Sequence, residues 1–165
     1  MINYTEKGAG LHQAIVNAGH ALRQLNGVWV SSNDAAVQSI IDNYTLVNAQ
    51  TDTINKVNDL TKIKFDKVIY GISAGEMAGW SVLRSEAIAY GKSTLETDCP
   101  TIVTEALARG VTVPVLVAKI NTNNTKYNNL RSSIAGQSGK HRDAIGGLLT
   151  FAAVSSYDYT TGWPL

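Results

Sequence analysis

The residues of this sequence with the most versatile chemistry are three histidines and a single cysteine. His12 and His20 flank a short apolar stretch near the N-terminus, and His141 lies far along the chain. On one helix the first two would lie about 12 Å apart along the axis, whereas zinc-bound nitrogens each lie about 2 Å from the metal. Neither has an acidic residue at the spacing of an HExxH motif, and Cys99 alone cannot form a thiolate cluster. We therefore expect no metal site and no cofactor, and we assign the histidines structural or helix-capping roles.

The common catalytic motifs are missing from the sequence. Cys99 precedes Pro100 without a histidine nearby, and no serine lies in a GxSxG turn. The glycine-rich stretch GISAGEMAG matches neither the GxGxxG nor the GxxxxGKS/T phosphate-binding pattern. We expect a protein that is not an enzyme and has no catalytic residues. The alternative is a small hydrolase built from His12, His141 and a carboxylate, which requires these groups to meet in space.

The composition suits a protein whose surface is covered by other subunits, and a neutral monomer is the alternative. Charged residues make up 16% of the 165 residues, against about 25% in typical globular proteins. The net charge is +1, and no run of Lys and Arg is present to bind nucleic-acid phosphates. The longest mostly apolar stretch, VTVPVLVAKI, falls short of the ~20 residues that span a bilayer, and the first residues lack a signal-peptide pattern. We therefore expect synthesis in a cytoplasm, with no membrane insertion and no nucleic-acid partner.

Residues 1–44 are expected to form a helix–hairpin–helix docking unit. Apolar residues share one helical face over 8–18, and Gly19 is suited to end that helix. The Asn-Gly pair at 26–27 lies between two apolar runs and predicts a two-residue hairpin turn. A second helix is expected to begin at residues 32–33. Because a two-stranded ribbon is marginal alone, the hairpin must pack on these helices.

Residues 45–70 carry apolar side chains at helical spacing, and Gly71 ends the run. Alternation of apolar and polar residues near 63–70 makes a short strand there an alternative. The sequence thus predicts a helix with a competing strand at its end.

Two further helices are predicted from their end signals. Ser73 and Glu76 have the spacing of a capping box, and the helix that they begin is expected to end at Gly91. Pro100 suits the first turn of the next helix, and Gly110 is suited to end it.

The last helical pattern is a heptad repeat that begins near residue 113 and continues for more than five repeats. A helix of ~40 residues would be ~60 Å long, although its glycines allow a break into two helices near GQSG at 136–139. We expect this apolar stripe to pack against copies of the chain or a partner, with Asn123, Gln137 and His141 setting the register. The predicted interface residues are Val113, Leu116, Ile120, Tyr127, Leu130, Ile134, His141 and Leu148.

The C-terminal residues 156–165 form a polar and aromatic tail without periodicity. Tyr157, Tyr159 and Trp163 have no local reason to be buried there. Because Tyr and Trp supply much of the contact energy of protein interfaces, we expect these three residues to belong to the partner interface. The alternative is that the tail folds back on its own domain.

Together these patterns predict a mainly α fold: a helical bundle with a long C-terminal helix and a small N-terminal helix–β-hairpin–helix unit. The expected organisation is the docking unit at 1–44, the helical bundle with its heptad-patterned helix at 45–155, and the aromatic tail at 156–165.

Several stretches resemble proteins of tailed bacteriophages and prophages. The segment YTEKGAGLHQAIVNAGHALRQLNGVWVSSNDAAVQSIIDNY resembles the start of small proteins encoded in tail modules. GISAGEMAGWSVLRSEAIAY, together with HRDAI, resembles a helical unit of tail-fibre and baseplate-associated proteins. The ending YDYTTGWP is similar to the Trp-Pro ending of tail-fibre assembly proteins.

The resemblance implies a structural component of a phage tail, in the tail-fibre or baseplate region, that mediates attachment between subunits. It implies a place in the virion after synthesis in the host cytoplasm. The partners would be other tail proteins and further copies of the chain. A tail-fibre assembly chaperone, which binds the fibre transiently, is the alternative.

Overall fold

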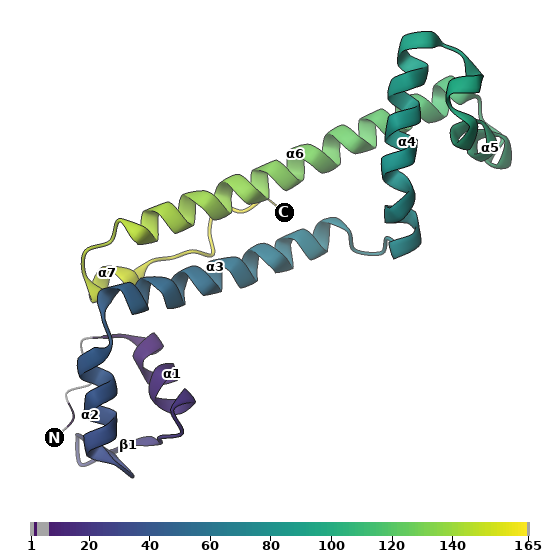
Figure 1. Cartoon of the computed structure of the whole chain (residues 1–165). Helices are drawn as coiled ribbons and strands as arrows, with labels where there is room; N and C mark the ends of the chain where they lie inside the picture. The colour runs from purple at the N-terminus through teal and green to yellow at the C-terminus, as the bar shows by residue number, and fades with distance from the viewer. Residues whose placement is uncertain (1, 3–6, 165) are drawn as a thin grey trace. The chain divides into compact units, whose positions relative to one another are not determined.

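The structure, a computed structural model, describes residues 2 and 7–164 and confirms the mainly α fold (Figure 1). A long helix lies late in the chain, and a two-stranded hairpin lies between helices near the N-terminus. The elements are α1 (Ala9–Asn17), β1 (Leu22–Leu25), β2 (Val28–Ser31), α2 (Asp34–Asn43), α3 (Leu46–Val68), α4 (Ala74–Ser93), the 3-10 helix η1 (Glu96–Asp98), α5 (Pro100–Arg109), α6 (Val113–Gly146) and α7 (Phe151–Ser156).

The chain divides into two compact units. The first contains the described residues up to Ile63 together with Ala135–Trp163, and the second is Lys64–Ile134. This division differs from the one expected at 1–44, 45–155 and 156–165. Tyr44 and Ala49, on either side of the first expected boundary, contribute to one hydrophobic core, so that boundary falls inside a packed unit.

The N-terminal segment has the helix–hairpin–helix order that its sequence predicts. Gly19, with φ 81°, follows the end of α1, and β1 pairs antiparallel with β2 across a two-residue turn. Asn26 and Gly27 in that turn have φ values of 50° and 80°, as a tight hairpin turn requires. The Asn33 side chain accepts a hydrogen bond of 3.1 Å from the Ala36 amide and caps α2.

One hydrophobic core joins this segment to α3 and α7. Leu11 and Ile15 of α1 pack with Val37 of α2, and all three side chains are fully buried. Val154 of α7 belongs to the same core, which is why residues from both ends of the chain form one unit. The buried members are Ile2, Leu11, Ile15, Val37, Ile41, Tyr44, Ala49 and Val154.

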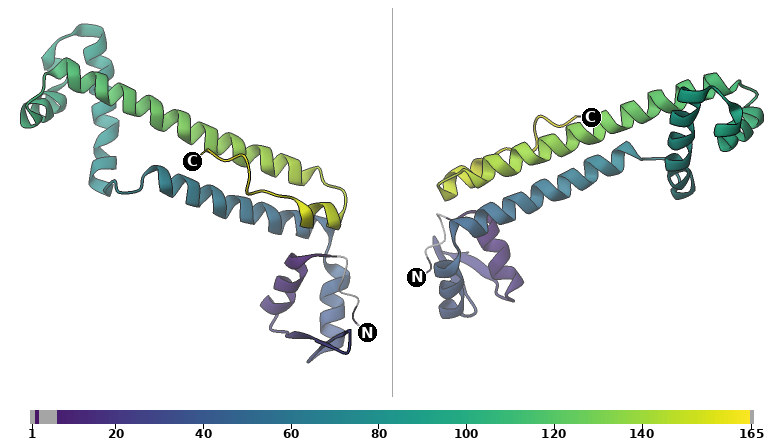
Figure 2. Two further views of the ribbon diagram at one scale, coloured as in Figure 1. Left: turned by 180° about the vertical axis from the view of Figure 1, so that it is seen from behind. Right: turned by 45° about the horizontal axis from the view of Figure 1, so that its top comes forward.

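α3 and the last part of α6 run side by side within the first unit (Figures 1 and 2). The hydroxyl oxygens of Thr61 and Ser138 form a hydrogen bond of 2.8 Å. Gln50 Nε2 donates to the carbonyl oxygens of Gly146 at 3.2 Å and Leu148 at 2.9 Å, and so satisfies acceptors at the end of α6. The pairs show that the two helices are antiparallel. Since α3 is helical to its end at Val68, the alternative of a strand near 63–70 is wrong.

α6 is one continuous helix of 34 residues, about 51 Å long. The alternative of a break at 136–139 is therefore wrong. Ser138, between the two glycines of that stretch, is buried and hydrogen-bonded to Thr61, so tertiary contacts offset the low helix propensity of glycine. The expected length of ~40 residues is too long, because the helix ends before Gly147. Leu148 consequently lies outside α6, although it continues the heptad spacing.

In the second unit, α4 begins with the predicted capping box. Ser73 Oγ accepts from the Glu76 amide at 3.2 Å, and Glu76 Oε2 accepts from the Ser73 amide at 3.2 Å. The expected end at Gly91 is wrong, because α4 continues to Ser93 and ends where Thr94 has φ 59°. The Thr94 amide still donates to a carbonyl one turn earlier, so the helix passes through the glycine without a break.

Glu86 of α4 caps the N-terminus of α5, where the local sequence provides no side-chain cap. Its Oε1 accepts from the Thr101 amide at 3.2 Å, and its Oε2 accepts from the Ile102 amide at 2.9 Å. A carboxylate there satisfies two free amides and lies at the positive end of the helix dipole. The two helices are thus joined by a charge-assisted contact.

Glu86→Ala is expected to lower the free energy of unfolding by about 1–2 kcal/mol, because two amides of α5 lose their acceptor. Urea unfolding followed by circular dichroism measures the change. Glu96→Ala removes the same charge from an exposed position in η1 and is the control. Equal destabilisation by the two variants would contradict the capping role.

Candidate partner-binding surface

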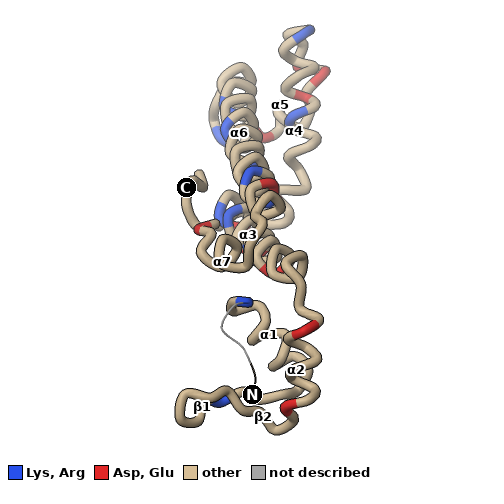
Figure 3. The backbone as a smooth tube through the Cα atoms, turned by 90° about the vertical axis from the view of Figure 1, so that its left-hand side faces the viewer, with Lys and Arg blue, Asp and Glu red and all other residues tan. Residues whose placement is uncertain are grey.

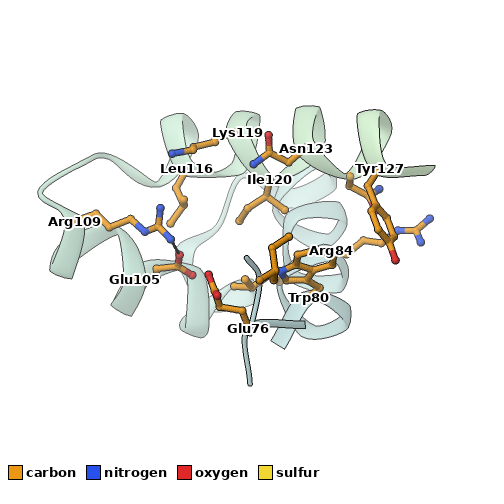
Figure 4. A pocket seen from close by; sticks show the side chains of 13 residues that line it. Glu76, Trp80, Arg84, Glu105, Arg109, Leu116, Lys119, Ile120, Asn123 and Tyr127 are labelled. Atoms are coloured by element: carbon orange, nitrogen blue, oxygen red, sulfur yellow. Dashed lines mark ion pairs between the residues drawn. The ribbon is translucent and has the colours of Figure 1, made fainter. Parts of the chain in front are cut away.

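The second unit contains a cavity of ≈ 310 Å³ between α4, α5 and α6, here named the α4–α6 cavity. Figure 4 shows Leu116 and Ile120 pointing from α6 into the space that Trp80 of α4 and Glu105 of α5 also line. This volume lies at the lower end of the range for ligand pockets, about 300–1,000 Å³. The apolar lining residues are Ile72, Trp80, Leu83, Leu116, Ile120 and Tyr127.

Two aromatic rings form one wall of the cavity. Trp80 and Tyr127 meet edge to face, with centroids 5.2 Å apart and planes at 79°. The Arg131 guanidinium lies 5.5 Å from the Tyr127 centroid and 5.7 Å from the Phe65 centroid, which is cation–π range. Edge-to-face packing and the cation restrict the Tyr127 ring, so the wall is held in a defined position.

The charged lining residues differ in how far they are neutralised. Glu105 and Arg109 form an ion pair one helical turn apart (Figure 4). Glu76 accepts hydrogen bonds from Ser73 in the capping box. Arg84 and Lys119 are exposed, and within residues 2 and 7–164 neither forms an ion pair. The cavity therefore combines an apolar aromatic wall with two cations that remain available to an anion.

Exposed apolar side chains accompany these cations. Ile88 lies one turn after Arg84 on α4, and Val115 lies one turn before Lys119 on α6. Seven of the twelve exposed large apolar side chains of the described chain lie in the second unit, although that unit has fewer residues. The seven are Tyr70, Val82, Ile88, Leu95, Leu107, Val111 and Val115.

The heptad residues pack inside the chain itself. Val113 and Leu116 are buried in the core of the second unit, where Ile120 packs beside them. Ile134 is fully buried, Leu130 is half-buried, and Leu148 packs beside the N-terminal core. Helices α3, α4 and α5 of the same chain thus account for much of the apolar stripe, while the predicted partner interface along it stays a prediction.

His141 holds the C-terminal tail against α6. Its Nδ1 lies 2.8 Å from Tyr157 Oη and its Nε2 lies 3.1 Å from the Thr161 carbonyl oxygen. Because a carbonyl only accepts, Nε2 is the donor in the contact with Thr161, and Gln137 Nε2 lies 3.0 Å from the same ring nitrogen. Gln137 Nε2 also donates to Thr161 O at 3.3 Å. The imidazole is 4% exposed and lies between the Tyr157 ring, which meets its edge, and the Trp163 ring, which stacks at 5.5 Å.

The tail folds back along α6 in Figures 1 and 2. This is the arrangement expected from the sequence as the alternative to a partner interface. Trp163 Nε1 donates to the Tyr159 carbonyl oxygen at 2.8 Å, and Tyr157, Tyr159 and Trp163 are all half-buried. Asp158 accepts hydrogen bonds from the Thr160 hydroxyl and amide, which lower the pKa of its carboxyl group. The three aromatic residues expected to meet a partner therefore pack on the chain's own surface.

The histidines do not form a common site in the described residues. His12 lies on an exposed face of α1. His20 follows Gly19 at the end of α1, and its amide donates to the Ile15 carbonyl oxygen at 3.1 Å. Both ring nitrogens of His141 are engaged by the tail, as described above. Across residues 2 and 7–164, no group of three His, Cys, Asp or Glu side chains is placed to hold a metal ion.

Cys99 is fully buried between α4 and α5, and burial raises the pKa of its thiol, with further increases from Glu86, Glu96 and Asp98. Iodoacetamide is expected to alkylate it at least about tenfold more slowly in the native chain than in urea, because only the exposed thiolate reacts. Mass spectrometry of the alkylated chain measures the rates, and equal rates in both states would contradict the buried placement.

The raised pKa of Cys99 also makes stability depend on pH. Because the folded chain keeps a proton that the unfolded chain releases, the contribution of Cys99 to the free energy of unfolding falls as the pH rises past the ordinary thiol pKa of 9.0.

Charge is sparse and mixed over the described chain, with blue and red positions interspersed along the helices in Figure 3. Among the described residues, no single helix has both the length and the apolar composition to cross a membrane. Only α5 and α6 taken together, with a bend of 105° between them, meet those two criteria.

The sequence did not single out Trp80, Arg84 and Lys119 as binding residues. The row of Trp80, Arg84 and Ile88 at four-residue spacing on α4 is a signal that could have identified one wall of the cavity. No pattern within α4 indicates that Lys119 of α6 lines the same cavity.

No family model matches the chain, and neither does any curated protein or solved structure.

Proposed function

We propose that this chain is a structural component of a bacteriophage tail, in the tail-fibre or baseplate region, and that it attaches one tail subunit to another. Its partners are fibre or baseplate proteins and further copies of itself, and its place is the virion after synthesis in the host cytoplasm. The resemblance of its N-terminal and α4 segments to tail-module proteins supports the class of assembly. The proposal assigns no catalytic role and no cofactor.

The observation that carries the proposal is the set of exposed apolar side chains of the second unit. Leu107 lies near the end of α5, Val111 lies in the connection that follows, and Val115 lies in the first turn of α6; all three are exposed, Leu107 by 82%. Apolar side chains gathered on one region of a protein mark a surface that another protein covers. Full burial of such a side chain contributes about 1.5–3 kcal/mol, so a few of them support a stable attachment.

This proposal places the attachment on the surface of the second unit where these apolar side chains are exposed. The buried heptad residues outside the cavity, such as Val113 and Ile134, are occupied by the chain's own packing. The low proportion of charged residues agrees with an attachment surface, because fewer ionic groups need to lose water when a partner covers it.

Mass spectrometry of purified virions, together with light scattering of the isolated chain, tests the proposal. We expect the chain in the virion at a fixed ratio to a tail protein, and Leu107→Asp with Val115→Asp should reduce its incorporation by about tenfold or more. Leu149→Asp is the matched control, because Leu149 is 85% exposed but lies between α6 and α7 in the first unit.

The outcomes separate the assignments. A chain that is abundant in the lysate and bound to fibre protein, but absent from purified virions, is an assembly chaperone. A strictly monomeric chain with no partner in either fraction overturns both. Equal incorporation of the control and the Leu107/Val115 variant would refute the attachment surface.

A further inference from the structure

We propose that the α4–α6 cavity binds an acidic and apolar peptide segment of the partner protein, with an apolar side chain against Trp80 and carboxylates toward Arg84 and Lys119. The inference rests on the proposed function, since it names the chemistry of the segment that is attached.

The interior of the cavity selects an apolar group. Trp80 and Tyr127 present ring surfaces there, and Leu116 and Ile120 point toward the same space from α6 (Figure 4). None of these residues brings a charge into the interior, so an apolar side chain of the partner would replace water at little electrostatic cost. At ≈ 310 Å³ the cavity accommodates one or two side chains, which is less than a folded domain and suits a short segment.

The charges around the cavity select an acidic neighbour for that apolar group. Five charged residues line it, three cationic and two anionic, which leaves an excess of one positive charge. Glu105 is neutralised by Arg109, and Glu76 accepts hydrogen bonds from Ser73, so the anions already have partners. Arg84 and Lys119 carry the charge that a carboxylate complements, and a basic segment would be repelled by them.

A peptide fits this surface better than a small free anion does. Ile88 and Val115 extend the rows of Arg84 and Lys119 by one helical turn, beyond the cavity itself. A single small carboxylate would leave both of these apolar side chains in water. A peptide segment that crosses the cavity reaches them, so the apolar surface outside the cavity and the cations at its edge are covered by one ligand.

The test uses the full chain with isotope label in its three tryptophan side chains, so that each indole N–H gives one NMR signal. The probe is the amidated peptide Ac-GDLFEG, and the neutral peptide Ac-GNLFQG is its matched control. We expect the Trp80 signal, assigned with Trp80→Phe, to shift saturably with the acidic peptide. The Trp29 and Trp163 signals should stay fixed, because these residues lie in the first unit.

Charge variants show whether the cations act as proposed. Arg84→Gln and Lys119→Gln should each weaken peptide binding about threefold, and the double variant about tenfold, as expected for exposed charge pairs. The double variant Arg23→Gln/Lys62→Gln removes the same charge from exposed positions of β1 and α3 and should bind as the unchanged chain does. The inference is overturned by a Trp80 signal that no peptide moves, by equal binding of the neutral peptide, or by equal weakening in the control double variant.

Failure here is distinguishable from failure of the proposed function. A chain that is present in virions but whose Trp80 signal ignores the peptide retains its structural role and loses this site. A chain that binds the acidic peptide through Trp80 but has no partner in the virion or in the lysate retains the site and loses the phage-tail assignment.

Discussion

Ile102→Ala is expected to lower the free energy of unfolding by about 2–5 kcal/mol, the range observed when a large buried aliphatic side chain is truncated. Ile102 is fully buried in α5 and packs in the core of the second unit with Ala87 of α4 and Leu116 of α6. Its removal leaves a cavity between three helices, and close-packed neighbours collapse into such a space only in part. Urea unfolding measures the loss, and amide hydrogen exchange should locate it in α4 and α5.

Leu107→Ala is the control for this variant. Leu107 lies on the same helix and has a side chain of the same size, but it is exposed. Its truncation should change the free energy of unfolding by no more than about 0.5 kcal/mol, since few contacts are lost. If the two variants were equally destabilised, α5 would not pack through the face that contains Ile102.

His141→Ala should lower the free energy of unfolding by about 2–4 kcal/mol and release the C-terminal tail. The imidazole bonds to the Tyr157 hydroxyl and the Thr161 carbonyl oxygen and stacks on Trp163. Its loss leaves a cavity and leaves the Tyr157 hydroxyl without its partner, while the Thr161 carbonyl oxygen keeps only the Gln137 amide, and these effects destabilise the folded chain. Chymotrypsin should then cleave after Tyr157 and Tyr159 at least about tenfold faster, because local opening exposes them.

Two further variants separate the role of the ring from other effects. Lys140→Ala removes an exposed neighbour on α6 and should leave both stability and cleavage unchanged within about 0.5 kcal/mol. Tyr157→Phe removes only the hydroxyl group that bonds to His141 and should cost about 0.5–1.5 kcal/mol. Unchanged cleavage in His141→Ala would show that the tail is held by other contacts.

The ends of several elements could be predicted from the sequence because the signals that fix them are local. The Asn26–Gly27 turn and the Ser73–Glu76 capping box each satisfy their backbone groups within a few residues. Gly91 shows the limit of such signals. A glycine permits a helix end without requiring one, and α4 continues because its backbone hydrogen bonds are kept as far as Thr94.

The candidate binding surface could not be predicted in the same way. Its wall residue Trp80 and its cation Lys119 belong to different helices, and each is a common residue for an amphipathic helix. What makes them a site is the cavity that they share, and the sequence contains no local pattern for a distance between helices. The same holds for Glu86, which caps a helix other than its own.

The sequence by itself determined the mainly helical fold, the N-terminal hairpin and the apolar stripe of α6, since all three follow from periodicity and from local caps. Only the tertiary structure decided what covers the stripe. A heptad pattern states that a helix face must be buried and leaves open whether its own chain or another buries it. Here α3, α4, α5 and the tail cover that face: Ser138 bonds to α3, Leu116 packs with α5, and His141 holds Tyr157 and Trp163. The chain itself buries those positions. The apolar side chains that stay exposed in the second unit are therefore the ones that the proposed attachment would use.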